Sequence, residues 1–368
     1  MSADGDGIGG TGGGPGPVEA GAAQDRNVVD IENLLSTGRY AEARRRATAL
    51  TVAEPGDADA LSLLARAVLG EGDPAAAVAV ADRAVAADPS SEYAHRIRAI
   101  VLQAAGRFEE SAAAAREATR LEPFSWPAWV QLAMSGSDVP AARTEAWEAG
   151  RQAVHLAPYE SASHLAMGVA AMDLDAATAR RAFAEALRLN PGDAQAINNL
   201  ALLDGRAGNI RAAADGFARA ASADPTEEIP RRNLRIALVA MLMYGHVGVW
   251  VVFVVFARVA RNLSEGSPVP RVLGLVFAAI VAVAVVLGVR QYRRMPVGLR
   301  RYALTLLRRD LVFGGWSAAL VVAVVLLGAG LLGPAGWRHE LVNAGLVPML
   351  VGVGLFLVAR WRLKRGRF

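Results

Sequence analysis

Apolar and polar residues alternate with the spacing of amphipathic helices along the first two thirds of the chain. From about Asn27 to Asp224, segments rich in Ala, Leu, Arg and Glu are separated by short breaks at Gly, Asp and Pro. Apolar residues three and four positions apart place one stripe of each segment toward a core. This region therefore predicts short helices joined by tight turns.

The helical segments repeat at a nearly constant interval. Small or aromatic residues recur before each break, as with Ala213, Phe217 and Ala220. A helix pair with a single apolar face is stable only when neighbouring pairs stack on it, so the pattern predicts a solenoid. Similar phrases end in prolines that are 34, 34, 35, 33 and 34 residues apart: Pro55, Pro89, Pro123, Pro158, Pro191 and Pro225. Glycines mark the expected turn inside four repeats: Gly38, Gly72, Gly106 and Gly208.

This pattern resembles the tetratricopeptide repeat (TPR) family. Residues 24–225 are similar to six such repeats, and the repeat starting at Ala194 matches the family pattern best. Residues 134–140 interrupt the fourth repeat, and the fifth lacks the turn glycine. The resemblance implies an all-α TPR α-solenoid of about six helix-turn-helix repeats over residues 25–229, whose first helices line a concave, partner-binding face.

The resemblance also implies which side chains would face a protein or peptide partner. Guanidinium groups grip carboxylates through two parallel hydrogen bonds, which suits a peptide with acidic groups or a free carboxylate. The alternative is that these arginines pair with surface Asp and Glu and only keep the face solvated. The predicted partner-binding residues are Arg66, Tyr93, Arg96, Gln103, Gln195, Asn198 and Arg206, with Asp59, Ser62, Ile100 and Leu202 beside them.

Long uncharged runs replace the repeats from Ile236 onward. A transmembrane helix needs about 20 apolar residues to cross a hydrocarbon core of about 30 Å. The sequence therefore predicts a membrane domain over residues 230–368 with four transmembrane helices. For the shortest run a buried helix is the alternative. The four runs are 236–257, 272–289, 311–333 and 341–359.

The basic residues are distributed unevenly around these runs. Residues 231–368 contain 19 Lys and Arg against three acids. Four spans place most of these cations on the side of the repeats, and cations accumulate on the cytoplasmic side of membranes. The arginine-rich, almost lysine-free composition is typical of GC-rich bacterial genes. We therefore expect a multi-pass protein of the bacterial inner membrane, with the repeats and both termini in the cytoplasm.

Two features of the apolar region are candidates for more than anchoring. Residues 290–310 have the pattern of a basic amphipathic helix on an anionic leaflet, although a simple topogenic loop is an equal alternative. His246 lies within the first run, where a hydrogen bond to another helix is favoured over a proton pathway. The predicted membrane-surface residues are Arg300, Arg301, Arg308 and Arg309.

No pattern typical of an enzyme stands out. The chain has no cysteine, and its five histidines have no metal-ligand spacing. A GxGxxG spelling at Gly7–Gly12 falls in a glycine-rich segment, residues 1–24, that we expect to be a disordered tail. We expect no catalysis, cofactor, metal or nucleic-acid partner, and predict a membrane-anchored scaffold or adaptor. A regulatory or accessory subunit of a transporter, channel or secretion complex is the main alternative, and a membrane enzyme that captures substrate with its repeats is another.

Overall fold

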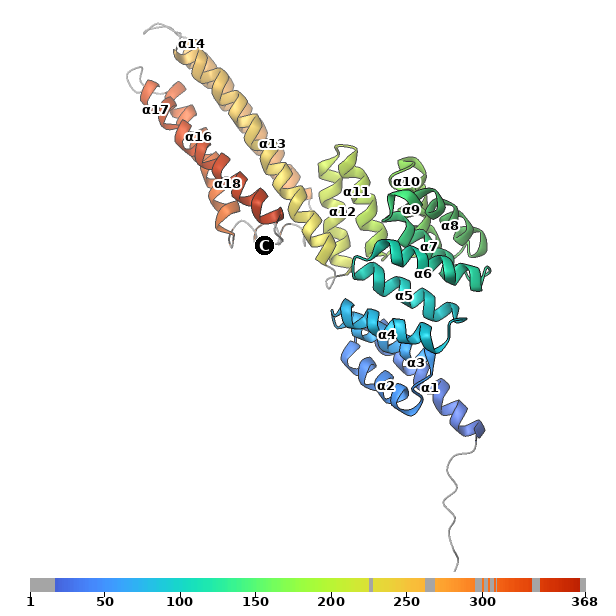
Figure 1. Ribbon diagram of the computed structural model, residues 1–368. Coiled ribbons are helices and arrows are strands. Elements are labelled where there is room, and N and C mark those ends of the chain that lie inside the picture. Colours follow the sequence, from blue (N-terminus) through green and yellow to red (C-terminus); the bar gives the residue numbers. More distant parts are fainter. Residues whose placement is uncertain are drawn as a thin grey trace, which may run out of the picture. The chain divides into compact units, whose positions relative to one another are not determined.

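The computed structural model is built from helices throughout the residues that it describes (Figure 1). Those residues are 17–224, 228–261, 269–294, 310–332 and 338–364, together with Arg300, Leu304 and Arg308. They fall into two compact units, Met1–Leu189 and Asn190–Phe368. Each unit is described separately below.

The first unit is a stack of helix pairs in which the first helices of successive repeats lie side by side. Contacts join α1 to α3, α3 to α5, α5 to α7, and α7 to α9, so these helices form one layer. A short 3-10 turn, η1 (Pro140–Ala142), joins the helices of the fourth pair. The bounds are α1 (Pro17–Ser36), α2 (Tyr40–Ala53), α3 (Ala58–Gly70), α4 (Pro74–Ala87), α5 (Glu92–Ala104), α6 (Phe108–Leu121), α7 (Trp126–Ser137), α8 (Arg143–Leu156), α9 (Ser161–Ala171) and α10 (Ala176–Leu189).

The predicted turns are confirmed, whereas the predicted disordered tail is partly helical. The four predicted turn glycines all have positive φ angles, from 72° at Gly38 to 88° at Gly72, which only glycine adopts without strain. The tail prediction was wrong for residues 17–24, because Pro17 begins α1 and is followed by Ala, Glu and Gln, which favour helices. Residues 1–16, including the GxGxxG spelling, lie outside the described residues.

Small side chains form the contact between the two helices of each repeat. Ala77, Ala81 and Ala84 on α4 are fully buried. In the fifth pair the fully buried ring of Phe183 lies against Gly168, where an added Cβ would be 2.4 Å from the ring. The recurring positions seen in the sequence are therefore the positions of closest helix approach.

A ring N–H ties the start of three repeats to the proline that precedes them. The Trp129 indole donates to the Pro123 carbonyl (2.8 Å), and the ring Nε2 of His95 and His164 makes the same bond to Pro89 and Pro158 (3.1 and 2.8 Å). The interval is six residues each time. This bond satisfies a carbonyl that proline leaves outside the helical ladder.

Replacing Trp129 by phenylalanine should weaken the third-to-fourth repeat junction. The ring remains, but the bond to the Pro123 carbonyl is lost, and we expect the free energy of unfolding to fall by about 1 kcal/mol. Urea unfolding of the purified full-length chain, followed by circular dichroism, measures the change. Trp126→Phe is the matched control, and an equal loss in both variants would contradict the role of the indole bond.

The second unit begins with one further helix pair and continues into a long helix. Its helices are α11 (Ala194–Arg206), α12 (Ile210–Ala223), α13 (Glu228–Arg261), α14 (Val269–Arg294), α16 (Leu311–Leu332), α17 (Arg338–Ala344) and α18 (Leu346–Lys364). α13 packs on α12 and then runs without a break into the first uncharged run. α13 therefore both packs on the last helix pair and leads directly into the apolar region.

The later helices of this unit meet around one buried polar contact. The Trp316 indole on α16 donates to Nδ1 of His246 on α13 (3.2 Å), and both side chains are buried. Gly352 on α18 leaves room for the imidazole, since a Cβ there would lie 2.5 Å from its Cε1 atom. His246 thus forms the interhelical bond that the sequence favoured.

Apolar side chains cover much of the remaining surface of these helices. Val272, Ile280 and Val283 on α14 are 57%, 48% and 58% exposed. Among the described residues, no helix is both long and apolar enough to cross a membrane. The four predicted transmembrane helices are therefore not supported as spans by the described structure.

Candidate functional site

The first helices of the first unit carry a connected set of polar side chains, which we call the Glu32–Ser125 chain. Arg66 on α3 forms an ion pair with Glu32 on α1 and donates to the Tyr93 hydroxyl on α5 (2.9 Å). Tyr93 in turn donates to Glu32 (3.3 Å). Four repeats thus contribute to one network, because the chain continues through three more side chains, Arg96, Glu92 and Ser125.

The second half of the Glu32–Ser125 chain is held by the same kinds of contact. The Arg96 guanidinium lies 5.1 Å from the centre of the Tyr93 ring and donates to Glu92 (2.8 Å). Ser125 at the start of α7 donates to the same Glu92 oxygen (3.2 Å). Glu92 is only 8% exposed, and these two donors satisfy its charge.

Electrostatics keep the central groups of this chain in defined protonation states. Burial opposes the charge of Arg66, but Tyr93 and Glu32 outweigh it, so the pKa of Arg66 is raised. Burial also raises the pKa of Tyr93, although Arg66 counteracts part of this effect. The phenol therefore stays protonated at neutral pH and remains a hydrogen-bond donor.

A second polar cluster, which we call the Gln103–Asp138 cluster, joins α5 to α7. Gln103 donates to Asp138 (2.8 Å), and Gln131 donates to the amide oxygen of Gln103 (3.2 Å). Gln131 also donates to Ser135 (2.8 Å), whose hydroxyl meets that of Ser111 (2.7 Å). Buried hydroxyls anchor the inner end of the cluster, while Gln103 and Asp138 lie at the surface.

The four predicted partner-binding residues of the first unit thus lie on one helix layer. Tyr93 contacts both Arg66 and Arg96, and Gln103 lies about two turns beyond Arg96 along α5. The prediction missed their partners Glu32 and Glu92. Glu32 lies one repeat interval of 34 residues before Arg66, and Glu92 lies one helical turn before Arg96. Ser62 is fully buried and donates to the Ala58 carbonyl (2.8 Å), so it does not face a partner.

The three predicted partner-binding residues of the second unit differ from one another in exposure and contacts. Gln195 is exposed, but Asn198 is 5% exposed and accepts a hydrogen bond from Asn233 on α13 (3.0 Å). Asn198 therefore fixes α13 on α11 instead of facing solvent. Arg206 is exposed and lines a cavity, as does Leu202.

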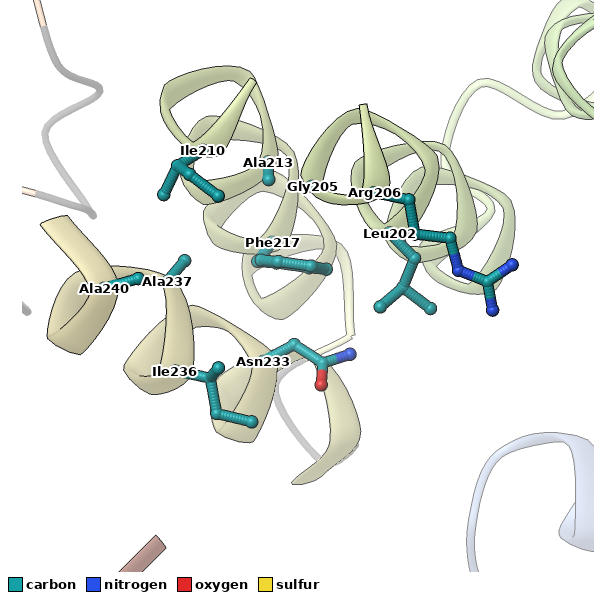
Figure 2. Close-up of a pocket in the computed structure, with 10 residues that line it drawn as sticks. All are labelled: Leu202, Gly205, Arg206, Ile210, Ala213, Phe217, Asn233, Ile236, Ala237 and Ala240. Atoms are coloured by element: carbon teal, nitrogen blue, oxygen red, sulfur yellow. The ribbon is translucent and has the colours of Figure 1, made fainter. Parts of the chain in front are cut away.

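This cavity, which we call the α11–α13 cavity, has a volume of about 340 Å³. Figure 2 shows Phe217 and Leu202 facing the hollow, with the Arg206 side chain extending outward beyond Leu202. Arg206 and Asn233 are its polar residues. The apolar and glycine positions are Leu202, Gly205, Ile210, Ala213, Phe217, Ile236, Ala237 and Ala240.

The other candidate sites offer fewer polar groups to a ligand or partner. A hollow of about 430 Å³ between α6, α7 and α8 is lined by Arg116 and Glu145, which form an ion pair across it (2.7 Å). In the part of the chain that the structure describes, no three acidic or histidine side chains are grouped to hold a metal. Of the predicted membrane-surface residues, Arg301 and Arg309 lie outside the described residues; Arg300 and Arg308 are helical, and Arg300 donates to the Arg293 carbonyl (2.8 Å).

The Arg66–Glu32 ion pair should contribute modestly to stability. A double-mutant cycle of Arg66→Met and Glu32→Gln is expected to give a coupling free energy of about 0.5–1 kcal/mol. The value is small because water screens side chains that are 30% and 42% exposed. Urea unfolding of the four proteins measures it, and the pair Arg151 and Glu148, 63% and 62% exposed, is the control expected to show no coupling. Equal couplings for both pairs would contradict the organised Glu32–Ser125 chain.

Part of the first unit is similar to a known protein family. Residues 32–92 match the family described as tetratricopeptide repeat. No curated protein matches the sequence significantly.

Several solved structures are similar to parts of this chain. They include the thermophilic TPR protein TTC0263 of Thermus thermophilus, at 18% identity and a TM-score of 0.45, covering 49% of this chain and 98% of that one. Pseudomonas aeruginosa PilF has 18% identity and a TM-score of 0.43, covering 57% and 96%. YrrB, titled a TPR protein with an unusual peptide-binding site, has 18% identity and a TM-score of 0.34, covering 50% and 95%.

These structures are too dissimilar for their ligands to indicate what this chain binds. The family match, however, covers α2, α3 and α4 of the described structure, where the turn glycine, the small buried residues and the 34-residue interval all occur together. Residues 32–92 therefore form a tetratricopeptide repeat segment of this chain.

Proposed function

We propose that this protein is a membrane-anchored scaffold that binds a protein or peptide partner on the layer of first helices. The observation that carries the proposal is the Glu32–Ser125 chain, in which charged and hydrogen-bonding groups from α1, α3, α5 and α7 share one layer. Such a layer offers a partner segment several fixed donors and acceptors in a row. Binding of this kind is non-covalent and needs no catalytic group.

The ion pairs within the Glu32–Ser125 chain limit which charged groups a partner can present to it. Arg66 and Arg96 are already engaged by Glu32 and Glu92, so a partner carboxylate has to share or displace these acids. A guanidinium has five N–H donors and can bind a second acceptor. Glu32 is 42% exposed and can also receive a cationic group. A polar segment that carries both charges therefore fits better than a purely acidic one.

The membrane part of the proposal rests on the sequence runs and on exposed aliphatic side chains. Val251 on α13, Val283 on α14 and Val325 on α16 are 55%, 58% and 62% exposed. Soluble proteins rarely expose such extended apolar surface, whereas a bilayer covers it without cost. We place the repeats and both termini in the bacterial cytoplasm because most cations flank the runs on that side.

Because no helix of the described residues meets the requirement for a span, membrane integration needs a direct test. The chain has no cysteine, so single cysteines can be labelled without background. Ser90→Cys in the repeats and Ser264→Cys between the first two runs are tested in intact cells with an impermeant maleimide. Labelling of the second alone, with resistance of the protein to carbonate extraction, is expected. Extraction by carbonate would exclude the membrane anchor.

Partner binding is tested by purification from the native host in mild detergent and mass spectrometry of the proteins that co-purify. Arg66→Glu/Arg96→Glu should remove a stoichiometric partner, whereas Arg151→Glu should not. Glu32→Arg/Arg66→Glu restores the internal pair in reversed order and separates loss of fold from loss of recognition. A partner that survives every variant would exclude this layer, and a transport or secretion complex among the partners would favour the accessory-subunit alternative.

A further inference from the structure

We propose that the α11–α13 cavity binds an aromatic side chain of the protein partner, carried next to an acidic residue. This inference rests on the proposed scaffold function and specifies the partner that it would bind. The cavity lies entirely within the second unit, and residues of α11, α12 and α13 line it.

The start of α13 takes the place of a seventh first helix. Glu228, its first residue, lies 34 positions after Ala194, the first residue of α11. Asn233 donates to Asn198 (3.0 Å) and holds the two helices together. The cavity therefore lies at a junction between repeats, which can be compared residue by residue with earlier junctions.

The first junction shows one way in which this space is filled. Five intervals of 34 residues separate Tyr40 from Ile210 and Gly70 from Ala240. At the first junction, the Tyr40 ring covers Gly70 so closely that an added Cβ would lie 2.2 Å from its Cδ1 atom. At the last junction, Ile210 and Ala240 both line the hollow.

The last junction therefore lacks the ring that closes the first one. Ile210 is shorter than tyrosine, and Gly205 contributes no side chain to the wall. An apolar hollow of this size has lost favourable packing contacts, and an aromatic side chain from outside would restore them. The internal precedent of Tyr40 favours a ring over a flexible lipid chain.

Positive charge beside the cavity favours an acidic residue next to the aromatic residue of the partner. Arg206 lines the cavity, and Arg232 is exposed one helical turn before Ile236 on the same face of α13. Within the described residues, no ion pair or hydrogen bond engages Arg232. A carboxylate next to the bound ring would meet these guanidinium groups in bidentate geometry.

The test uses the full-length chain in mild detergent and a fluorescein-labelled peptide, Gly-Ser-Glu-Phe-Glu-Ser-Gly, followed by fluorescence anisotropy. We expect the parent peptide to bind about ten times more tightly than its Phe→Ala form, because the ring supplies the buried contact. Its Glu→Gln form should bind about five times more weakly than the parent. Three equal affinities would overturn the proposal.

A variant that rebuilds the first junction supplies the decisive control. Ile210→Tyr/Ala240→Gly places a ring of the protein's own in the cavity and should weaken the parent peptide about ten-fold while preserving thermal stability. Ile229→Tyr, at an exposed position outside the cavity, should change nothing. Unchanged binding in the filled variant would overturn the proposal. So would displacement of the peptide by dihexanoyl phosphatidylglycerol at lower concentration than by unlabelled peptide, since a lipid would then be the occupant.

The native partner separates this inference from the scaffold function. If the partner found by co-purification depends on Arg66 and Arg96 but binds the filled variant normally, the scaffold stands and the aromatic site is excluded. Loss of that partner from the filled variant supports both.

Discussion

Replacing Phe183 by alanine is expected to lower the free energy of unfolding of the first unit by about 3–5 kcal/mol. The ring is fully buried between α9 and α10 and occupies the space that Gly168 leaves open. Its removal deletes apolar contacts and leaves a cavity that the two helices cannot close, because their separation is also set by neighbouring repeats. Urea unfolding of the purified full-length chain, followed by circular dichroism, measures the loss.

A second phenylalanine provides the matched control for this change. Phe124 is 86% exposed at the end of the third repeat, so Phe124→Ala should alter stability by less than about 0.5 kcal/mol. Phe183→Leu keeps most of the volume and should recover more than half of the loss. If Phe183→Ala and Phe124→Ala had equal effects, the α9–α10 contact would not be the tight core that its burial implies.

The repeat architecture of the first unit could be read from the sequence because its determinants are local and periodic. The positive φ angles fall at the glycines predicted for turns, such as Gly106, and the recurring small residues are buried at 34-residue intervals. Each of these features depends only on a residue and its spacing. The boundaries of α1 were not predictable in this way, because the glycines before Pro17 masked the helix-favouring residues after it.

The polar contacts on the layer of first helices were only partly predictable. Spacing placed Arg66 and Arg96 on first helices, but the chain has 35 acids and the prediction did not single out Glu32 and Glu92 as their partners. Asn198 was predicted to face a partner because the repeat pattern placed it on the concave face, yet Asn233 on α13 donates a hydrogen bond to it. The α11–α13 cavity exists because the side chains at Gly205 and Ile210 are too small to fill the space between the helices. No sequence motif indicates such an unfilled space, so the cavity was not predicted.

Replacing Trp316 by alanine should have a comparable effect on the second unit. Trp316 is fully buried, its ring centre lies 5.5 Å from that of Phe356 on α18, and its indole donates to His246 on α13. We expect a loss of about 3–5 kcal/mol, because a cavity forms and the imidazole nitrogen loses its donor. For a unit of this size that corresponds to a fall of about 6–20 °C in the temperature of half-unfolding.

The measurement is the fraction of detergent-purified protein that remains in the monodisperse peak of size-exclusion chromatography after heating. Trp250→Ala is the control, since Trp250 is 40% exposed on α13 and should be nearly neutral. Equal effects of the two tryptophans would mean that Trp316 does not join α13, α16 and α18.

A pair of glycines tests the same contact from the opposite helix. Gly352→Ala places a methyl group 2.5 Å from the His246 ring and should destabilise the protein by about 1–3 kcal/mol, because the ring has to move away from Trp316. A Cβ added at Gly354 would meet no side chain or other helix within 4 Å, so Gly354→Ala should be neutral or slightly stabilising through higher helix propensity. A loss of stability seen only for Gly352→Ala would show that α18 packs tightly against His246 on α13. Because α13 is unbroken from Glu228 to Arg261, the helix held by this contact is also the helix that lines the α11–α13 cavity.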